Sequence, residues 1–243
     1  MQIITLNLTN PGVTLTAYIP EQSKEIPQLA KRRAMLVLPG GGYKFCSDRE
    51  GEPIALEFLN RGFASFVLKY SLGEDSKFPR PLNDAEEALE LIRAKADEWH
   101  IDPDKVAVIG FSAGGHLASA LSTMGRVRPN LQILGYPCIL EKISPILSCV
   151  IPGTDEQVDS LTPPAFIFAS AEDDVVPIEN SLKYAEALDR NGIPFEMHIF
   201  NKGYHGFSLA GATSYAEKEH LEYNARCAAW TGLCADWMDK MFE

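Results

Sequence analysis

The sequence predicts an α/β fold, with a mostly parallel sheet of about eight strands flanked by helices. Short apolar runs alternate with amphipathic helical patterns, which is typical of β/α units. The chain has 243 residues, of which 46% are hydrophobic and 23% are charged, so it can bury one large core. No repeat or change of composition divides it. We therefore expect a single domain over residues 1–243.

Eight apolar runs have the lengths and boundaries of strands. The first two flank a turn at Asn10-Pro11-Gly12, where proline and glycine interrupt the extended pattern. The third run ends at Pro39, and the fourth follows a helix that stops at residues 60–62. The predicted strands are residues 3–8, 13–19, 34–38, 64–68, 106–109, 131–136, 165–169 and 196–200.

Helical segments lie between these runs. Residues 84–99 place apolar side chains on one face at helical spacing, and residues 178–191 do the same before a glycine ends the pattern. A last helix is predicted from about residue 215 to 241, with a break near Gly232. Residues 141–164 have no clear periodicity, so we expect at most a minimal lid there.

The composition disfavours several classes of function. The formal net charge of −11 disfavours a nucleic-acid partner, because an anionic polymer would be repelled. No stretch approaches the roughly 18 apolar residues of a membrane span, and residues 1–7 lack a signal-peptide pattern. The five cysteines are scattered without zinc-site spacing. We expect a cytoplasmic protein with reduced thiols and no membrane partner, metal or cofactor.

A glycine-flanked serine follows the strand predicted at residues 106–109. The stretch Gly110-Phe111-Ser112-Ala113-Gly114 precedes a helical pattern at residues 115–123. In such a strand–turn–helix, glycines remove side-chain collisions and the serine hydroxyl is exposed at the carboxyl edge of the sheet. We predict that Ser112 is a nucleophile and that the helix start supplies backbone N–H groups. A glycine-rich turn with an ordinary serine is the alternative.

A run of three glycines follows the strand at residues 34–38, in Pro39-Gly40-Gly41-Gly42-Tyr43. Ester hydrolysis places negative charge on the carbonyl oxygen, and backbone N–H groups must already point there. We predict that Gly41 and Gly42 supply such donors and that Ala113 supplies another. A phosphate-binding loop is disfavoured, because the Lys-Ser/Thr pair of such loops is absent. A flexible loop without this function is the remaining alternative.

Two acidic residues and a histidine follow the last two predicted strands. Asp173 comes sooner after its strand and is the predicted acid, with Asp174 as the alternative. His205 lies between glycines and is the predicted base. The order Ser112, Asp173, His205 is the chain order of a nucleophile, acid and base on this kind of sheet. The other histidines lie in or beside predicted helices and strands: His100, His116, His198 and His220.

These motifs resemble those of the α/β-hydrolase esterases, especially the bacterial group related to acetyl-xylan and feruloyl esterases. The similar stretches are residues 38–43, 49–53, 110–117, 162–166, 176–182 and 203–209. The resemblance implies a serine hydrolase whose triad is Ser112, Asp173 and His205 and whose oxyanion donors are Gly41, Gly42 and Ala113. The chain departs from many relatives at Pro39, where they carry a histidine that steadies the glycine loop. It also departs at Ala169-Ser170, which keeps the exact position of the acid open.

The resemblance implies a carboxylic ester hydrolase that removes acetyl or other short acyl groups from sugars or small oligosaccharides. Its partner would be a small-molecule ester. A peptidase of the same fold is one alternative, although such enzymes usually carry a propeller or large cap for which this chain has no room. A non-catalytic binding protein of hydrolase fold is another, disfavoured because all three triad candidates are present. Residues 141–164 and four aromatic side chains belong either to the substrate site or elsewhere, in the core or on the surface: Tyr43, Phe45, Tyr136 and Phe207.

Overall fold

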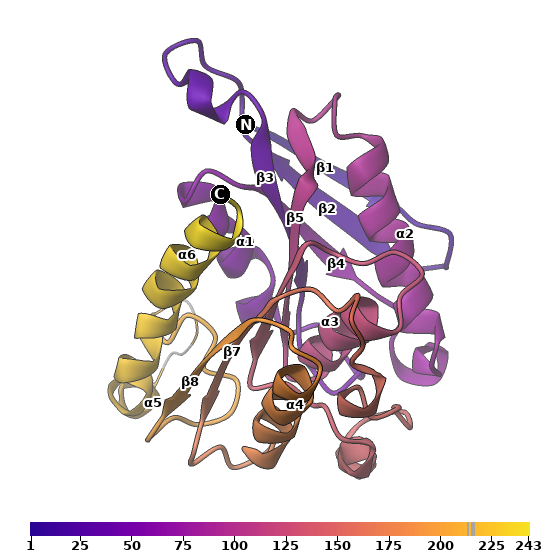
Figure 1. Ribbon diagram of the computed structural model, residues 1–243, viewed down its shortest axis with the longest axis vertical. Helices are drawn as coiled ribbons and strands as arrows, with labels where there is room; N and C mark the ends of the chain where they lie inside the picture. Colours follow the sequence, from indigo (N-terminus) through magenta and orange to yellow (C-terminus); the bar gives the residue numbers. More distant parts are fainter. Residues whose placement is uncertain (213, 215–216) are drawn as a thin grey trace.

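The computed structural model describes residues 1–212, 214 and 217–243, and its strands form one eight-stranded sheet (Figure 1). The strands are β1 (Gln2–Asn7), β2 (Thr14–Ile19), β3 (Arg32–Leu38), β4 (Ala64–Lys69), β5 (Ile101–Phe111), β6 (Leu131–Gly135), β7 (Ala165–Ser170) and β8 (Phe195–Phe200). Their order is β1-β2-β4-β3-β5-β6-β7-β8. The β1–β2 and β2–β4 pairs are antiparallel and the other pairs are parallel, which confirms the predicted fold class.

Helices cover both faces of the sheet (Figure 1). They are α1 (Glu52–Asn60), α2 (Arg80–Ala94), α3 (Ala113–Thr123), α4 (Glu179–Arg190), α5 (Lys218–Asn224) and α6 (Trp230–Met241). Buried side chains of α2, α3 and α4 join one apolar cluster, and those of α1 and α6 join a second cluster on the other face. No helix in the described part of the chain has both the length and the apolar character needed to cross a membrane.

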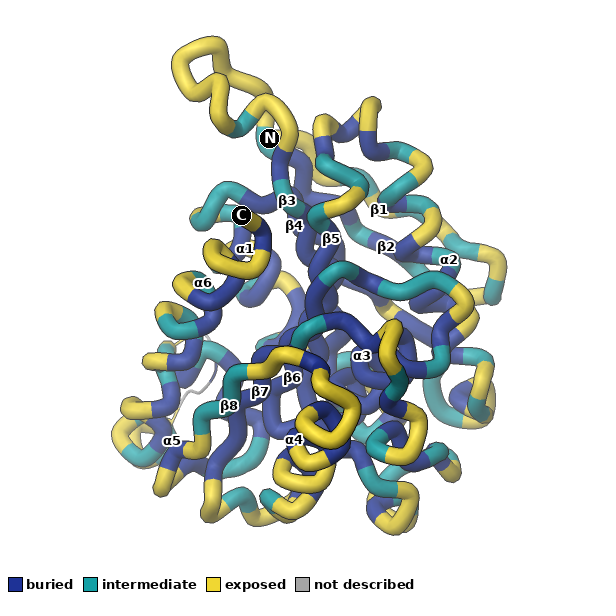
Figure 2. Tube along the Cα trace, viewed as in Figure 1, coloured by how far each residue is buried: buried dark blue, intermediate teal, exposed yellow. Residues whose placement is uncertain are grey.

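The central strands read as continuous apolar runs because both of their faces are buried. Residues 34–38 of β3 are fully buried, and β7 is buried along its whole length. The edge strands β1 and β8 are instead partly exposed. Figure 2 shows the same distribution, with a buried sheet, exposed outer helix surfaces and an exposed segment at residues 20–31 that projects at one end.

One predicted helix begins and ends earlier than expected. The helix predicted at residues 84–99 runs from Arg80 to Ala94. Its first turn contains Pro81, which is compatible with helix there because the first N–H groups have no partner inside the helix. The residues that follow Ala94 form turns.

The break predicted near Gly232 is wrong. Gly232 lies inside α6, and the chain breaks instead at residues 225–229, a 3₁₀ turn between α5 and α6. A glycine costs only about 1 kcal/mol in a helix. The burial of Trp230 and Trp237 on the same helix offsets that cost. The predicted start of the last helix at Tyr215 lies outside the described residues.

The segments that carry the predicted site residues meet at one edge of the sheet. β3, β5, β7 and β8 point the same way, so the segments that follow them leave at the same carboxyl edge, at the lower end in Figure 1. The glycine loop follows β3, Ser112 follows β5, the two aspartates follow β7, and His205 follows β8. Both chain termini lie at the opposite end.

Candidate active site

Ser112 occupies the turn between β5 and α3, with a φ of 53° and a ψ of −117°. A positive φ is strained for a residue with a side chain, and it persists only where the surrounding structure holds it. Here the N–H of Ser112 donates to the carbonyl of Gly135 at 3.0 Å. A Cβ at Gly110 would collide with the carbonyl of Gly114, and one at Gly114 would collide with that of Leu38. The tight turn therefore requires glycine at both flanking positions.

Three side chains from separate loops form one hydrogen-bonded series. The Ser112 hydroxyl lies 2.8 Å from His205 Nε2, and His205 Nδ1 lies 2.8 Å from Asp173 Oδ2. With the ring proton on Nδ1 donated to the carboxylate, Nε2 is left to accept the serine proton. The side chain of Asp173 is only 1% exposed and that of His205 is 14% exposed, so this series is largely shielded from water.

The structure places the two neighbouring aspartates differently. Asp173 directs Oδ2 at the imidazole, while its Oδ1 accepts the N–H groups of Val175 and Val176 at 2.9 and 2.8 Å. Asp174 accepts the backbone N–H of His205 at 3.1 Å through Oδ1. Asp173 therefore faces the ring, whereas Asp174, the alternative acid, accepts the backbone N–H of the same histidine.

The glycine loop leaves backbone donors at the site. Gly41 and Gly42 have φ values of 126° and 63°, which favour glycine. A Cβ at Gly41 would also collide with the carbonyl of Phe45. Within the described residues, the N–H groups of Gly41, Gly42 and Ala113 donate to no protein acceptor. Gly41 and Gly42 line the same cavity as Ser112, so their amides are available to a ligand there.

A cavity of about 190 Å³ opens at Ser112 and His205. Part of it is formed by the segment that we expected to form a minimal lid, which contains the 3₁₀ helices Glu141–Ile146 and Asp155–Gln157. The large apolar side chains of the lining are Phe45, Ile146, Leu147 and Val175. Three of these side chains are exposed to solvent: Phe45, Ile146 and Val175. The cavity thus presents apolar surface beside the Ser112 hydroxyl.

Of the four aromatic side chains considered in the sequence, only Phe45 lines this cavity. The other three are buried in the core: Tyr43, Tyr136 and Phe207. Sequence alone could not separate these cases, because an aromatic residue after a strand suits a loop tip and a core equally well.

A buried glutamate, which sequence reasoning missed, links the glycine loop to the histidine loop. Glu50 is 2% exposed, and its two oxygens accept the Gly40 N–H at 2.9 Å and the Tyr136 hydroxyl at 2.7 Å. The Tyr136 oxygen also accepts the Ser208 N–H at 3.0 Å. The Tyr136 ring packs edge-on against His205, with centroids 5.0 Å apart. In the sequence, Glu50 belongs to a stretch that resembles relatives, but no local pattern signals its burial.

His116 joins the glycine loop to residues 148–154. It is fully buried, Nδ1 accepts the Tyr43 hydroxyl at 2.8 Å, and Nε2 donates to the carbonyl of Pro152 at 3.0 Å. Burial lowers the pKa of His116 to about 4, so the ring is neutral at neutral pH. Ser148 adds a second link, because its N–H donates to the carbonyl of Gly42 at 2.9 Å.

A buried thiol lies beside the Ser112 hydroxyl. Cys138 Sγ is 4.0 Å from Ser112 Oγ. Burial raises the pKa of the Cys138 thiol to about 12, which keeps it protonated and weakly nucleophilic. In the part of the chain that the structure describes, no group of three or more His, Cys, Asp and Glu side chains could hold a metal ion.

The sequence matches two family models. The BD-FAE model matches residues 16–142, and the prolyl oligopeptidase family model matches residues 153–230. The chain is also similar to an acetylxylan esterase of Xylanibacter ruminicola, with 34% identity over 237 residues that cover 88% of this chain and 48% of the esterase. The chain thus spans about half the length of that esterase, and about a third of another curated relative.

Solved structures extend the similarity along the whole chain. The α/β hydrolase MGS-M1, from a Medee basin deep-sea metagenome, has a TM-score of 0.94 and 45% identity and covers 99% of this chain and 98% of its own. The acetyl ester-xyloside bifunctional hydrolase of Caldicellulosiruptor lactoaceticus has a TM-score of 0.81 and 35% identity. That similarity covers 97% of this chain and 91% of the hydrolase.

Proposed function

The chain belongs to the BD-FAE family and has the α/β-hydrolase fold, and on that premise we propose that it is a carboxylic ester hydrolase. It removes acetyl or other short acyl groups from sugars or small oligosaccharides. The observation that carries this proposal is the hydrogen-bonded series of Ser112, His205 and Asp173 beside a small cavity. The similarity to an acetylxylan esterase and to an acetyl ester-xyloside hydrolase supports a sugar as the alcohol.

In the proposed mechanism, His205 Nε2 takes the Ser112 proton while Oγ attacks the ester carbonyl. Asp173 holds the ring in the required tautomer and stabilises the imidazolium that forms. His205 then gives its proton to the oxygen of the leaving alcohol. An acyl group remains on Ser112, and a water activated by His205 releases it.

The negative charge of each tetrahedral intermediate needs donors that are already in place. The proposed donors are the backbone N–H groups of Gly41, Gly42 and Ala113. The cavity of about 190 Å³ lies below the roughly 300–1,000 Å³ of typical small-molecule sites. This small size supports a short acyl group over a long one.

A substrate panel tests the proposal against its alternatives. We expect turnover of p-nitrophenyl acetate and acetylated xylo-oligosaccharides, weaker turnover of feruloyl esters, and none of aminoacyl or dipeptidyl amides. Amide cleavage that exceeds ester cleavage would favour a peptidase. The prolyl oligopeptidase family model, which matches residues 153–230, relates to that alternative. The absence of turnover on every compound would favour a non-catalytic binding protein.

Glu50 is proposed as a positioning residue for this reaction, because it holds both loops that surround the ester. In Glu50→Gln, the amide oxygen can keep the Gly40 N–H, but the N–H₂ group then faces Tyr136 and cannot accept its proton, so the Tyr136 hydroxyl loses the acceptor that orients it. Loss of a single oxyanion donor costs about 10²–10³-fold, and a displaced loop should cost less. We expect kcat for p-nitrophenyl acetate to fall about tenfold to a hundredfold with little change in KM.

The split between kcat and KM separates positioning from folding. Circular dichroism melts of Glu50→Gln would report any loss of stability independently of rate. A variant with a lower melting temperature but the kcat of the parent would mean that Glu50 is only structural.

The domain organisation and location follow as parts of the same proposal. One sheet runs through the described chain and two apolar clusters cover its faces, which supports a single domain. All five cysteines are free thiols, which supports a reducing compartment such as the cytoplasm. The partner is a small ester, without nucleic acid or membrane.

A further inference from the structure

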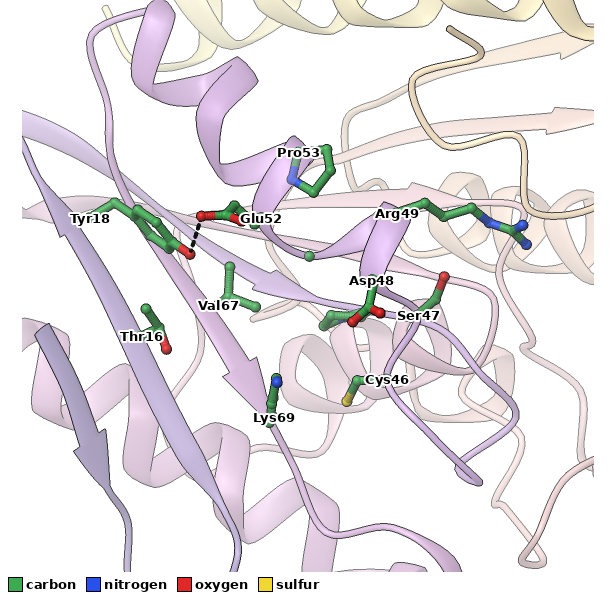
Figure 3. A pocket seen from close by; sticks show the side chains of 12 residues that line it. Thr16, Tyr18, Cys46, Ser47, Asp48, Arg49, Glu52, Pro53, Val67 and Lys69 are labelled. Carbon is green, nitrogen blue, oxygen red and sulfur yellow. Dashed lines mark hydrogen bonds between the residues drawn. The ribbon is translucent and has the colours of Figure 1, made fainter. Parts of the chain in front are cut away.

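A second cavity, of about 430 Å³, lies beside the candidate active site (Figure 3). Strands β2 and β4 form one side of it through Thr16, Tyr18, Val67 and Lys69. The segment at residues 46–53 forms the other side. This cavity is therefore built between the antiparallel part of the sheet and the segment that connects the glycine loop to α1.

The two cavities adjoin each other. Ser47 and Arg49 line both of them, so they lie on two sides of one short segment. That segment is fixed to the histidine loop, because the Ser208 hydroxyl donates to the carbonyl of Arg49 at 2.6 Å. The Arg49 side chain also packs over Gly206, where an added Cβ would collide with the guanidinium. A ligand that occupies both cavities would thus pass over the segment that contains Ser47 and Arg49.

The charged side chains of the larger cavity suit a neutral polar ligand. Two carboxylates, Asp48 and Glu52, and two cations, Arg49 and Lys69, give its lining no formal net charge. Among the described residues, neither Asp48 nor Lys69 has an ion-pair partner within 4.0 Å. Figure 3 shows them on facing sides of the space, Lys69 on β4 and Asp48 on the opposite segment. Both groups keep hydrogen-bonding capacity for a ligand.

Hydroxyl-rich ligands match this lining better than ions do. A sugar hydroxyl can donate to a carboxylate and accept from an ammonium group, so opposite charges on facing sides serve the same ring. Tyr18 and Glu52 add a further polar pair, since the Tyr18 hydroxyl donates to Glu52 at 3.3 Å. A simple anion would face Asp48 and Glu52, and a simple cation would face Arg49 and Lys69.

We propose that this cavity binds an unacylated sugar unit of an oligosaccharide whose acylated unit lies at Ser112. The inference rests on the proposed function and names the substrate class of the same site. The catalytic cavity of about 190 Å³ holds the ester, and the neighbouring cavity of about 430 Å³ has the usual size of a small-molecule site. An oligosaccharide therefore gains contacts that an acetylated monosaccharide does not reach.

Direct binding of an unacetylated oligosaccharide tests this without any turnover. Xylotriose is titrated by calorimetry into the Ser112→Ala protein, alone and combined with Asp48→Asn or Lys69→Met. Each added substitution removes one charged hydrogen-bonding group and should weaken binding about tenfold. Lys183→Met is the matched control, because Lys183 is exposed on α4 and lines neither cavity, and it should leave the affinity unchanged.

The outcomes separate the two proposals. Undetectable xylotriose binding, or equal affinity in all the variants, would overturn the sugar site even if the parent protein hydrolyses p-nitrophenyl acetate. Binding that depends on Asp48 and Lys69, in a protein without esterase activity, would keep the sugar site and overturn the proposed function. Both substituted residues are exposed, and a thermal melt confirms that each variant is folded.

Discussion

Replacing Ser112 with alanine is expected to lower kcat/KM for p-nitrophenyl acetate by about 10⁴-fold or more. The substitution removes the hydroxyl oxygen that lies 2.8 Å from His205 Nε2. Without it no acyl-enzyme can form. The remaining rate would come from the backbone donors and from binding alone, which typically leave a small residual activity.

The matched control is Ser160→Ala. Ser160 is exposed and lies outside the candidate site, so its substitution should change neither activity nor stability. Labelling by a fluorophosphonate gives a second readout, because the probe reacts with an activated serine. Turnover by Ser112→Ala near that of the parent, or labelling that persists in it, would show that the nucleophile is elsewhere.

Asp173→Asn is expected to lower kcat by about 10³–10⁴-fold, and Asp174→Asn by less than tenfold. Asp173 uses both oxygens, one for the imidazole and one for the N–H groups of Val175 and Val176. An asparagine has one carbonyl oxygen, so its N–H₂ group would face His205 Nδ1. The ring would then carry its proton on Nε2 and could not accept the Ser112 proton.

Asp174→Asn changes less because its role is an acceptor for a backbone N–H, which an amide oxygen also fills. The two variants remove the same charge at adjacent positions, so they form a matched pair. Steady-state rates from pH 5 to 9 measure the effect. A large loss in Asp174→Asn with an active Asp173→Asn would reverse the assignment of the acid.

Most of the fold could be predicted from local sequence patterns. Buried parallel strands are continuous apolar runs, and residues 34–38 and 165–169 lie inside the strands that the structure contains. The glycines at 110 and 114 follow from short-range sterics within one turn, so the sequence could indicate them. The predicted break at Gly232 was wrong because it relied on intrinsic helix propensity alone. Intrinsic propensity is a weak term of about 1 kcal/mol, and tertiary packing of α6 overrode it.

Sequence by itself determined the sheet class, the tight turn around Ser112 and the order of the three polar loops, because each is recorded in local residue patterns or in the order of residues along the chain. Tertiary structure alone decided which of Asp173 and Asp174 faces the imidazole, that Glu50 is buried against Tyr136, and that a second cavity adjoins the first. The partners in these cases are 32 residues apart for the acid and histidine and 86 apart for Glu50 and Tyr136. The choice of partner at such separations depends on how whole loops pack, and no periodicity or spacing in a single sequence records that.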